Sequence, residues 1–138
     1  MQWLAENSLL LLGILFLLTM TLKGPMMARA YGIRSITVHD LAKLLAESNP
    51  PLLLDVRTLP EFNGGHVKQA VSVPLWEVRK RLDHLRQEGE GRPVVVICRS
   101  GNRSLQGAVA LKRAGFQEVI NVVGGMANWE AQGYPIKK

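Results

Sequence analysis

Residues 93–104 read PVVVICRSGNRS, an apolar run that passes directly into a polar loop. Three consecutive valines and an isoleucine are typical of a strand that is buried on both faces of a sheet. From Arg103 to Ala114 the apolar positions recur at helical spacing, and Gly115 follows as a stop signal. This stretch therefore predicts a strand, a tight loop and a helix, which is the repeating unit of α/β proteins.

The same alternation extends over the chain from residue 35 onward. Short apolar runs predict four further strands, at 36–38, 52–56, 70–73 and 118–123. Helices are expected after a capping box formed by Thr37 and Asp40, at 60–62, along 75–85 and over 126–132. The pattern predicts an α/β domain over residues 35–138, with a mostly parallel sheet of about five strands flanked by helices.

The N-terminal segment differs from this domain in composition. Residues 4–22 are almost entirely apolar, with Glu6 as their only charged side chain. Their length approaches the roughly 20 apolar residues that a membrane-spanning helix needs. Basic side chains follow the segment and none precedes it, which places the C-terminal part in the cytoplasm. We expect a single-pass transmembrane anchor at 1–23 in the lipid bilayer, a juxtamembrane linker at 24–34, and a cytoplasmic catalytic domain.

Two alternatives to the anchor remain open. A cleaved signal peptide is one, because Ala28-Arg29-Ala30 resembles a small-residue cleavage site. Against it, the residues before the apolar run include no Lys or Arg, and Lys23 follows the run directly. A helix buried in the core of a soluble protein is the other alternative.

Overall composition excludes several classes of site. The chain has one cysteine, which rules out a disulfide within the chain and a zinc site built from several cysteines. Three scattered histidines show no metal-ligand spacing, so we expect no metal. The net charge of +6 includes a basic stripe at 79–81, but no nucleic-acid-binding motif accompanies it, and no nucleic-acid partner is expected.

Cys98 lies where the PVVVI strand ends and the polar loop begins. In open α/β sheets, ligands bind at the carboxyl ends of strands. A strand, a tight loop and a helix start direct backbone N–H groups inward, which favours a thiolate over a thiol. Arg99 and Arg103 add positive charge. The residues therefore predict a nucleophilic sulfur that acts on an anionic substrate, and the alternative is a small buried packing residue.

CRSGNRS at 98–104 also resembles the active-site loop of single-domain rhodaneses, the thiosulfate sulfurtransferase family. Three other segments are similar to the family's signatures and follow in the family's order: LLLDVR at 52–57, GHVKQAVSVP at 65–74 and GGMANW at 124–129. The resemblance covers about residues 35–136 and implies a rhodanese-like fold. One departure is Val67-Lys68-Gln69, where the family often has Ile-Pro-Gly.

The resemblance implies a sulfurtransferase in which Cys98 attacks thiosulfate or a related sulfane-sulfur donor. The persulfide on Cys98 would pass its sulfur to cyanide or to a thiol acceptor, which can be a protein. The substrate-binding residues would be Arg99, Ser100, Gly101, Asn102, Arg103 and Ser104. No metal or organic cofactor is implied. Related phosphatases have a loop one residue longer, which argues against phosphatase activity. The alternative function is a membrane-tethered sulfur-relay or adaptor module that delivers persulfide to a specific protein partner.

Three further residues are expected to support the site. Asp55 and Arg57 follow the strand at 52–56 and either support the site electrostatically or form a salt bridge that pins this strand to the loop. Glu61 would be a further partner of that pair, or solvated. His66 is either a general base or a hydrogen-bonded structural histidine.

Two glycines precede the last expected helix. Gly124-Gly125 could bind an anion, or could let the chain turn close to the active-site loop.

Overall fold

Five parallel strands form one sheet in the order β1-β5-β4-β2-β3 in a computed structural model that describes residues 1–138. The strands are Arg34–Ile36 (β1), Leu52–Asp55 (β2), Val71–Ser72 (β3), Val94–Ile97 (β4) and Val119–Val122 (β5). The helices are Gln2–Glu6 (α1), Ser8–Tyr31 (α2), Val38–Leu45 (α3), Leu59–Asn63 (α4), a 3-10 helix at Leu75–Lys80 (η1), Leu82–Gly89 (α5), Asn102–Arg113 (α6) and Gly125–Ala131 (α7). The predicted parallel α/β fold is confirmed.

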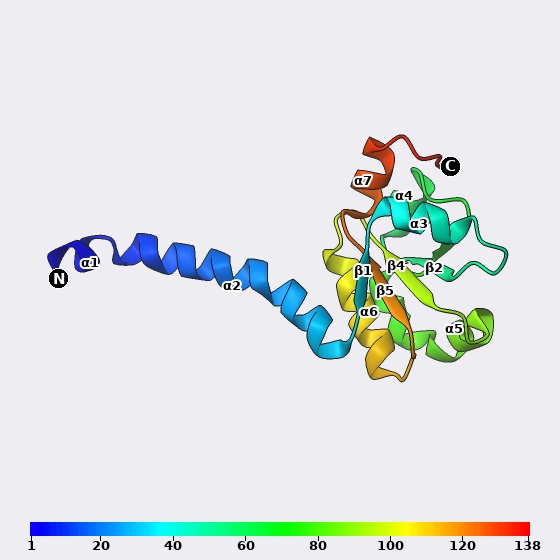
Figure 1. Cartoon of the computed structure of the whole chain (residues 1–138), viewed down its shortest axis with the longest axis horizontal. Coiled ribbons are helices and arrows are strands. Elements are labelled where there is room, and N and C mark those ends of the chain that lie inside the picture. The colour runs from blue at the N-terminus through cyan, green and yellow to red at the C-terminus, as the bar shows by residue number, and fades with distance from the viewer.

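Two apolar layers hold helices on both faces of the sheet (Figure 1). Successive residues of β4 point to opposite faces, so that Val96 joins one layer and Ile97 the other. The end of α2, with η1, α5 and α6, covers the first face, and α3 and α7 cover the second. All four residues of β4 are buried, which explains its uninterrupted apolar sequence.

The structure corrects two predicted boundaries. The first strand ends at Ile36 and not at Val38, because the Thr37 side chain accepts a hydrogen bond from the Asp40 N–H and caps α3. This capping box is the one that the sequence predicts. The single helix expected along 75–85 is instead η1 followed by α5, separated at Arg81. The three-residue step from Leu75 to Val78 suits a 3-10 helix, which has three residues per turn.

α2 projects from the domain and contacts it only near its C-terminal end (Figure 1). By length and composition it could cross a membrane, and a signal sequence would meet the same criteria. The helix continues without a break past Lys23 and ends at Gly32, whose φ of 68° is left-handed. In the segment predicted as a linker, Ala28 and Ile33 are buried in the layer that also contains α6.

Candidate active site

Cys98 follows the central strand β4, at the edge of the sheet where the parallel strands end. β2 lies on one side of β4, with Asp55 opposite Ile97, and β5 lies on the other side. The carboxyl ends of these strands therefore surround the cysteine, as expected for ligand sites in parallel α/β sheets. The Cys98 side chain has no exposed surface.

The loop after β4 folds around the sulfur. The Gly101 N–H donates a hydrogen bond to Cys98 Sγ over 3.0 Å, and Ser104 Oγ lies 3.3 Å from the sulfur. Gly101 has a φ of 110°, a conformation that a residue with a side chain rarely adopts. Burial raises the pKa of the Cys98 thiol, but hydrogen bonds from Ser104 and from loop N–H groups outweigh it and lower the pKa below its usual value.

Asn121 extends this hydrogen-bond network and was not singled out from the sequence. Ser104 Oγ donates to Asn121 Oδ1 over 2.6 Å, and Asn121 Nδ2 donates to the Gly101 carbonyl over 3.4 Å. A serine hydroxyl has one proton, so Ser104 must turn it from Asn121 toward Cys98 to stabilise the thiolate. The available signal was a polar side chain within the buried strand VINV.

Ser104→Ala is expected to raise the pKa of Cys98, because the thiolate loses a hydrogen-bond donor while the burial remains. Alkylation by iodoacetamide, followed against pH, should show its midpoint at higher pH than in the parent protein. At neutral pH the rate should fall by about tenfold to 150-fold, since a hydrogen bond to a charged group contributes about 1.5–3 kcal/mol. The exposed Ser48→Ala serves as a control, and an unchanged midpoint in Ser104→Ala would show that this hydroxyl does not stabilise the thiolate.

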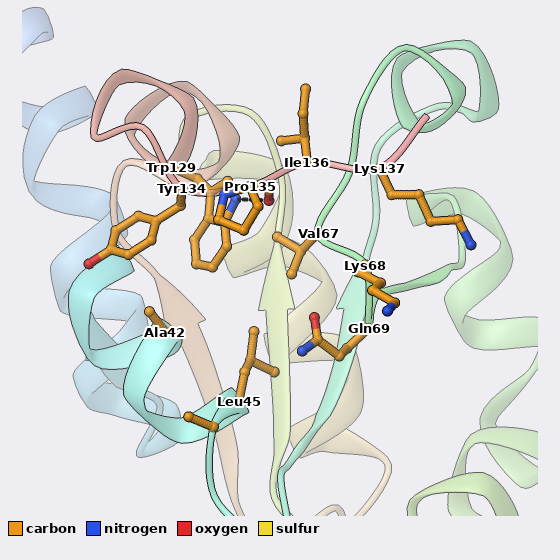
Figure 2. A pocket seen from close by; sticks show the side chains of 11 residues that line it. Ala42, Leu45, Val67, Lys68, Gln69, Trp129, Tyr134, Pro135, Ile136 and Lys137 are labelled. Carbon is orange, nitrogen blue, oxygen red and sulfur yellow. Dashed lines mark hydrogen bonds between the residues drawn. The ribbon is translucent and has the colours of Figure 1, made fainter.

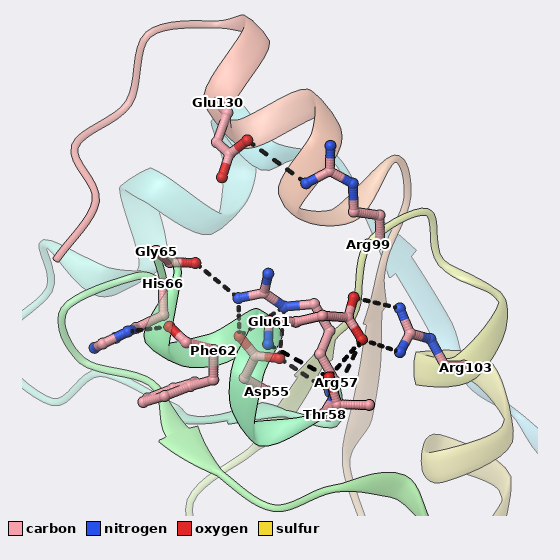
Figure 3. Close-up of polar contacts among 10 residues, drawn as sticks. All are labelled: Asp55, Arg57, Thr58, Glu61, Phe62, Gly65, His66, Arg99, Arg103 and Glu130. Atoms are coloured by element: carbon pink, nitrogen blue, oxygen red, sulfur yellow. Dashed lines mark hydrogen bonds and ion pairs between the residues drawn. The ribbon is translucent and has the colours of Figure 1, made fainter. Parts of the chain in front are cut away.

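Both arginines of the loop face carboxylates (Figure 3). Arg103 makes two hydrogen bonds to Glu61, at 2.6 and 2.9 Å, and Arg99 lies 3.7 Å from Glu130. The Arg103 guanidinium lowers the pKa of Glu61 to about 2, so Glu61 is ionised near neutral pH. Glu61 is therefore a partner of the loop through Arg103, and no ion pair joins it to Arg57. The positive charge of the loop is largely compensated.

Asp55 and Arg57 form a buried ion pair at the end of β2. Arg57 Nη2 lies 2.7 Å from Asp55 Oδ2, and the two side chains are 2% and 0% exposed. The same nitrogen donates to the Gly65 carbonyl over 2.9 Å (Figure 3). The pair thus joins the end of β2 to Gly65, after the helix α4 that carries Glu61, and no hydrogen bond or ion pair joins it to the Cys98 loop. A buried pair of this kind destabilises the fold strongly when one partner is removed.

His66 lies on the far side of this segment. Its Nδ1 is 2.8 Å from the Phe62 carbonyl oxygen, and its ring stacks on Phe62 with centroids 3.7 Å apart. Its backbone pairs with Lys137 near the C-terminus. These contacts match the alternative of a hydrogen-bonded structural histidine, and no hydrogen bond joins its ring to Cys98.

The first turn of α7 is hydrogen-bonded to the backbone of the Cys98 loop. The Met126 N–H donates to the Cys98 carbonyl over 2.8 Å, and the Ala127 N–H donates to the Arg99 carbonyl over 3.0 Å. A Cβ on Gly125 would lie 2.7 Å from the Arg99 carbonyl oxygen and would overlap the Cys98 carbonyl. The interpretation that these glycines bring the chain close to the active-site loop is confirmed.

The largest pocket lies elsewhere, between α3 and the C-terminal residues (Figure 2). Its volume is about 560 Å³, and Trp129 forms one wall, with its Nε1 donating to the Pro135 carbonyl. None of its lining residues belongs to the Cys98 loop. No group of three His, Cys, Asp or Glu side chains comes together in a way that could hold a metal ion.

Comparison with known proteins identifies the family to which the chain belongs. The model of the rhodanese-like domain matches residues 37–132, so the chain belongs to the rhodanese-like family. A crystal structure of a rhodanese-related protein from Thermoplasma volcanium is 29% identical and has a TM-score of 0.66, with 75% of this chain and 97% of that chain covered.

Two curated relatives bear on function. Thiosulfate sulfurtransferase 16 from Arabidopsis thaliana is 39% identical over 113 residues, which are 75% of this chain and 90% of the relative. The putative sulfur carrier protein YrkF from Bacillus subtilis is 43% identical over 77 residues, 56% of this chain, and the match spans only 40% of YrkF. These relatives support sulfur transfer as the general class of function.

Proposed function

We propose that the protein is a membrane-anchored sulfurtransferase that carries sulfane sulfur as a persulfide on Cys98, with thiosulfate or a related molecule as donor. The observation that carries this proposal is the loop around Cys98, in which N–H groups and Ser104 favour the thiolate. A cysteine whose pKa is lowered by hydrogen bonds is more fully ionised at neutral pH, and the thiolate is the nucleophilic form.

The proposed reaction has two steps. The Cys98 thiolate attacks the outer sulfur of thiosulfate, the sulfur–sulfur bond of the donor breaks, and sulfite leaves with the bonding electrons. A cyanide ion or a thiolate then attacks the outer sulfur of the persulfide, and Cys98 leaves as a thiolate. The loop N–H groups stabilise negative charge on sulfur in both steps. Because Cys98 is the only cysteine in the chain, no second thiol of this sequence can accept the sulfur.

Mass spectrometry of the intact chain after incubation with thiosulfate tests this proposal. We expect a mass increase of one sulfur atom on Cys98, removed by cyanide with release of thiocyanate. Absence of the added sulfur with thiosulfate and with an organic persulfide donor would contradict a sulfurtransferase function.

Glu61→Gln is expected to improve the use of thiosulfate, because it removes the charge that compensates Arg103. The KM for thiosulfate should fall by about threefold to tenfold, and its dependence on ionic strength should become steeper. Glutamine keeps an oxygen for the capping box with Thr58, so the start of α4 should be retained. Glu77→Gln, which breaks an exposed ion pair on η1, is the matched control. A KM that is unchanged or higher in Glu61→Gln would contradict this account.

A second candidate function is a sulfur relay or adaptor that serves one protein partner. The pairing of Arg99 and Arg103 with carboxylates favours it. With their charge compensated, the two arginines attract a small anionic donor only weakly. Slow turnover of thiosulfate together with rapid transfer of the Cys98 persulfide to a protein that co-purifies would support the relay over the simple enzyme.

We further propose that α2 is retained as a single-pass anchor and that the domain lies in the cytoplasm. Support comes from Ala28, which is only 8% exposed because it packs into the domain, so cleavage after Ala30 would remove a packed segment. A reporter fused after Lys138 should give a cytoplasmic signal. A mature N-terminus near Tyr31 would instead identify a signal peptide.

A further inference from the structure

The C-terminal part of α2 forms one wall of a cleft beside the active-site loop. The cleft has a volume of about 220 Å³ and combines residues of α2, the Cys98 loop, α6 and the adjoining strand ends. Its lining comprises Gly24, Pro25, Ala28, Ser35, Ser100, Gly101, Asn102, Leu105, Asn121 and Val123. The helix that precedes the domain in sequence therefore borders the loop that holds the nucleophile.

The contact between α2 and α6 fixes this arrangement. Gly24 and Ala28 lie one turn apart on the face of α2 that meets α6, and a Cβ on Gly24 would lie 3.6 Å from Leu105 Cδ2. Small residues at this spacing allow two helices to approach closely. α2 runs from Ser8 to Tyr31 with Pro25 inside it, so the docked end follows the apolar part along one helix. The domain therefore has a defined height relative to the apolar part.

That height places the loop at the level of lipid headgroups. At 1.5 Å per residue, Gly24 and Ala28 lie about 3 and 9 Å along the helix beyond Leu22, where the apolar run ends. The headgroup layer on each side of a bilayer is about 5–8 Å thick. Figure 1 shows α6 on the side of the domain from which α2 departs. Of the α2 residues that line the cleft, Gly24 thus lies within the headgroup layer and Ala28 at its outer edge.

The chemistry of the cleft matches an amphiphilic molecule. Leu105, Pro25 and the 54% exposed Val123 provide apolar surface next to the helix that leads into the bilayer. Ser100 and Asn102 provide polar groups at the loop. A molecule with an apolar tail and a polar head would match the cleft from the bilayer side.

We propose that α2 holds the Cys98 loop at the headgroup level, and that the sulfur acceptors this site serves best are amphiphilic thiols dissolved in the bilayer. The thiolate of the acceptor attacks the outer sulfur of the Cys98 persulfide, the bond between that sulfur and Sγ breaks, and Cys98 leaves as a thiolate. The acceptor becomes a persulfide, and no oxidant or reductant is consumed. This inference rests on the proposed function and on the anchor.

Transfer from the loaded full chain in phosphatidylcholine–phosphatidylglycerol vesicles tests the inference. The probes are dodecanethiol, which partitions into the bilayer, and glutathione, which stays in water. The decisive variant carries eight Gly and Ser residues between Lys23 and Gly24, which separates the bilayer from the domain and changes no residue that lines the cleft. The matched control carries the same insertion between Met1 and Gln2, at the other end of the apolar helix.

We expect the insertion after Lys23 to lower the ratio of dodecanethiol to glutathione rates by at least about tenfold, because a fixed site gains from the high local concentration of a membrane-dissolved thiol. The control insertion should leave the ratio unchanged. Equal ratios in both variants would overturn the inference. A chain that loads no persulfide from any donor would instead contradict the proposed function, so the two failures are distinguishable.

A depth measurement provides a readout that does not depend on activity. In Cys98→Ser protein, a fluorophore is attached to a new cysteine either at Asn102, beside the cleft, or at Ser48, in the connection between α3 and β2. In vesicles that contain headgroup-labelled nitroxide lipid, quenching should be strong at Asn102 and weak at Ser48. The insertion after Lys23 should remove this difference, and equal quenching at both positions without the insertion would overturn the proposed placement.

Discussion

Cys98→Ser should lower thiosulfate:cyanide turnover by at least about 10³-fold, the scale of loss seen when a covalent nucleophile is removed. Serine is close in size to cysteine, so the loop should keep its contacts with Gly101 and Ser104. The hydroxyl, however, is not ionised at neutral pH and cannot form a persulfide. The effect should therefore appear as a loss of chemistry and not as a loss of folded protein.

Steady-state turnover and intact-mass measurements check this expectation together. The variant should gain no sulfur from thiosulfate, while its thermal unfolding stays close to that of the parent chain. Turnover within tenfold of the parent protein would mean that sulfur does not pass through Cys98. A large fall in unfolding temperature would instead assign the residue a packing role.

Gly125→Ala should destabilise the domain strongly and displace the Cys98 loop. Gly125 has a φ of 51°, and its Cβ would meet the carbonyl groups of Cys98 and Arg99. Left-handed backbone in alanine costs about 1–2 kcal/mol. Overpacking in a close-packed region typically adds about 1–3 kcal/mol. The sum predicts a destabilisation of about 2–5 kcal/mol and a displaced active-site loop.

Gly133→Ala separates the two contributions. Gly133 also has a positive φ, of 78°, but no atom lies within 4 Å of its added Cβ, so only the backbone strain applies. The free energy of unfolding, measured with denaturant in detergent, should therefore be clearly lower for Gly125→Ala than for Gly133→Ala. Persulfide loading should also slow in Gly125→Ala only. Equal stabilities for the two variants would show that the contact between α7 and the loop tolerates a side chain.

The sequence predicted those parts of the fold that depend on neighbouring residues. The buried strand before Cys98 followed from its apolar run, and the start of α3 followed from the Thr37–Asp40 spacing, because both signals act over a few residues. Strand ends were displaced by one or two residues where a helix cap competed with the ladder, as at Thr37.

Contacts between distant residues could not be predicted in the same way. Arg103 pairs with Glu61, 42 residues earlier, and Ser104 pairs with Asn121, 17 residues later. Such partners become neighbours only because the strands β2, β4 and β5 lie side by side. The sequence identified the charged loop but not its neutralising carboxylates. It identified an apolar helix but not its docking on α6.

The strand order also determines when the domain can be completed during synthesis. β1, which follows α2 directly, pairs only with β5, the last strand of the chain. A ribosome that has produced α2 and the first strand must add about 80 further residues before that strand finds its partner. The Cys98 loop is completed later still, because its carbonyl groups accept hydrogen bonds from the N–H groups of Met126 and Ala127. With α2 as the proposed anchor, the nascent chain would therefore reach the membrane before the loop around its thiol is assembled.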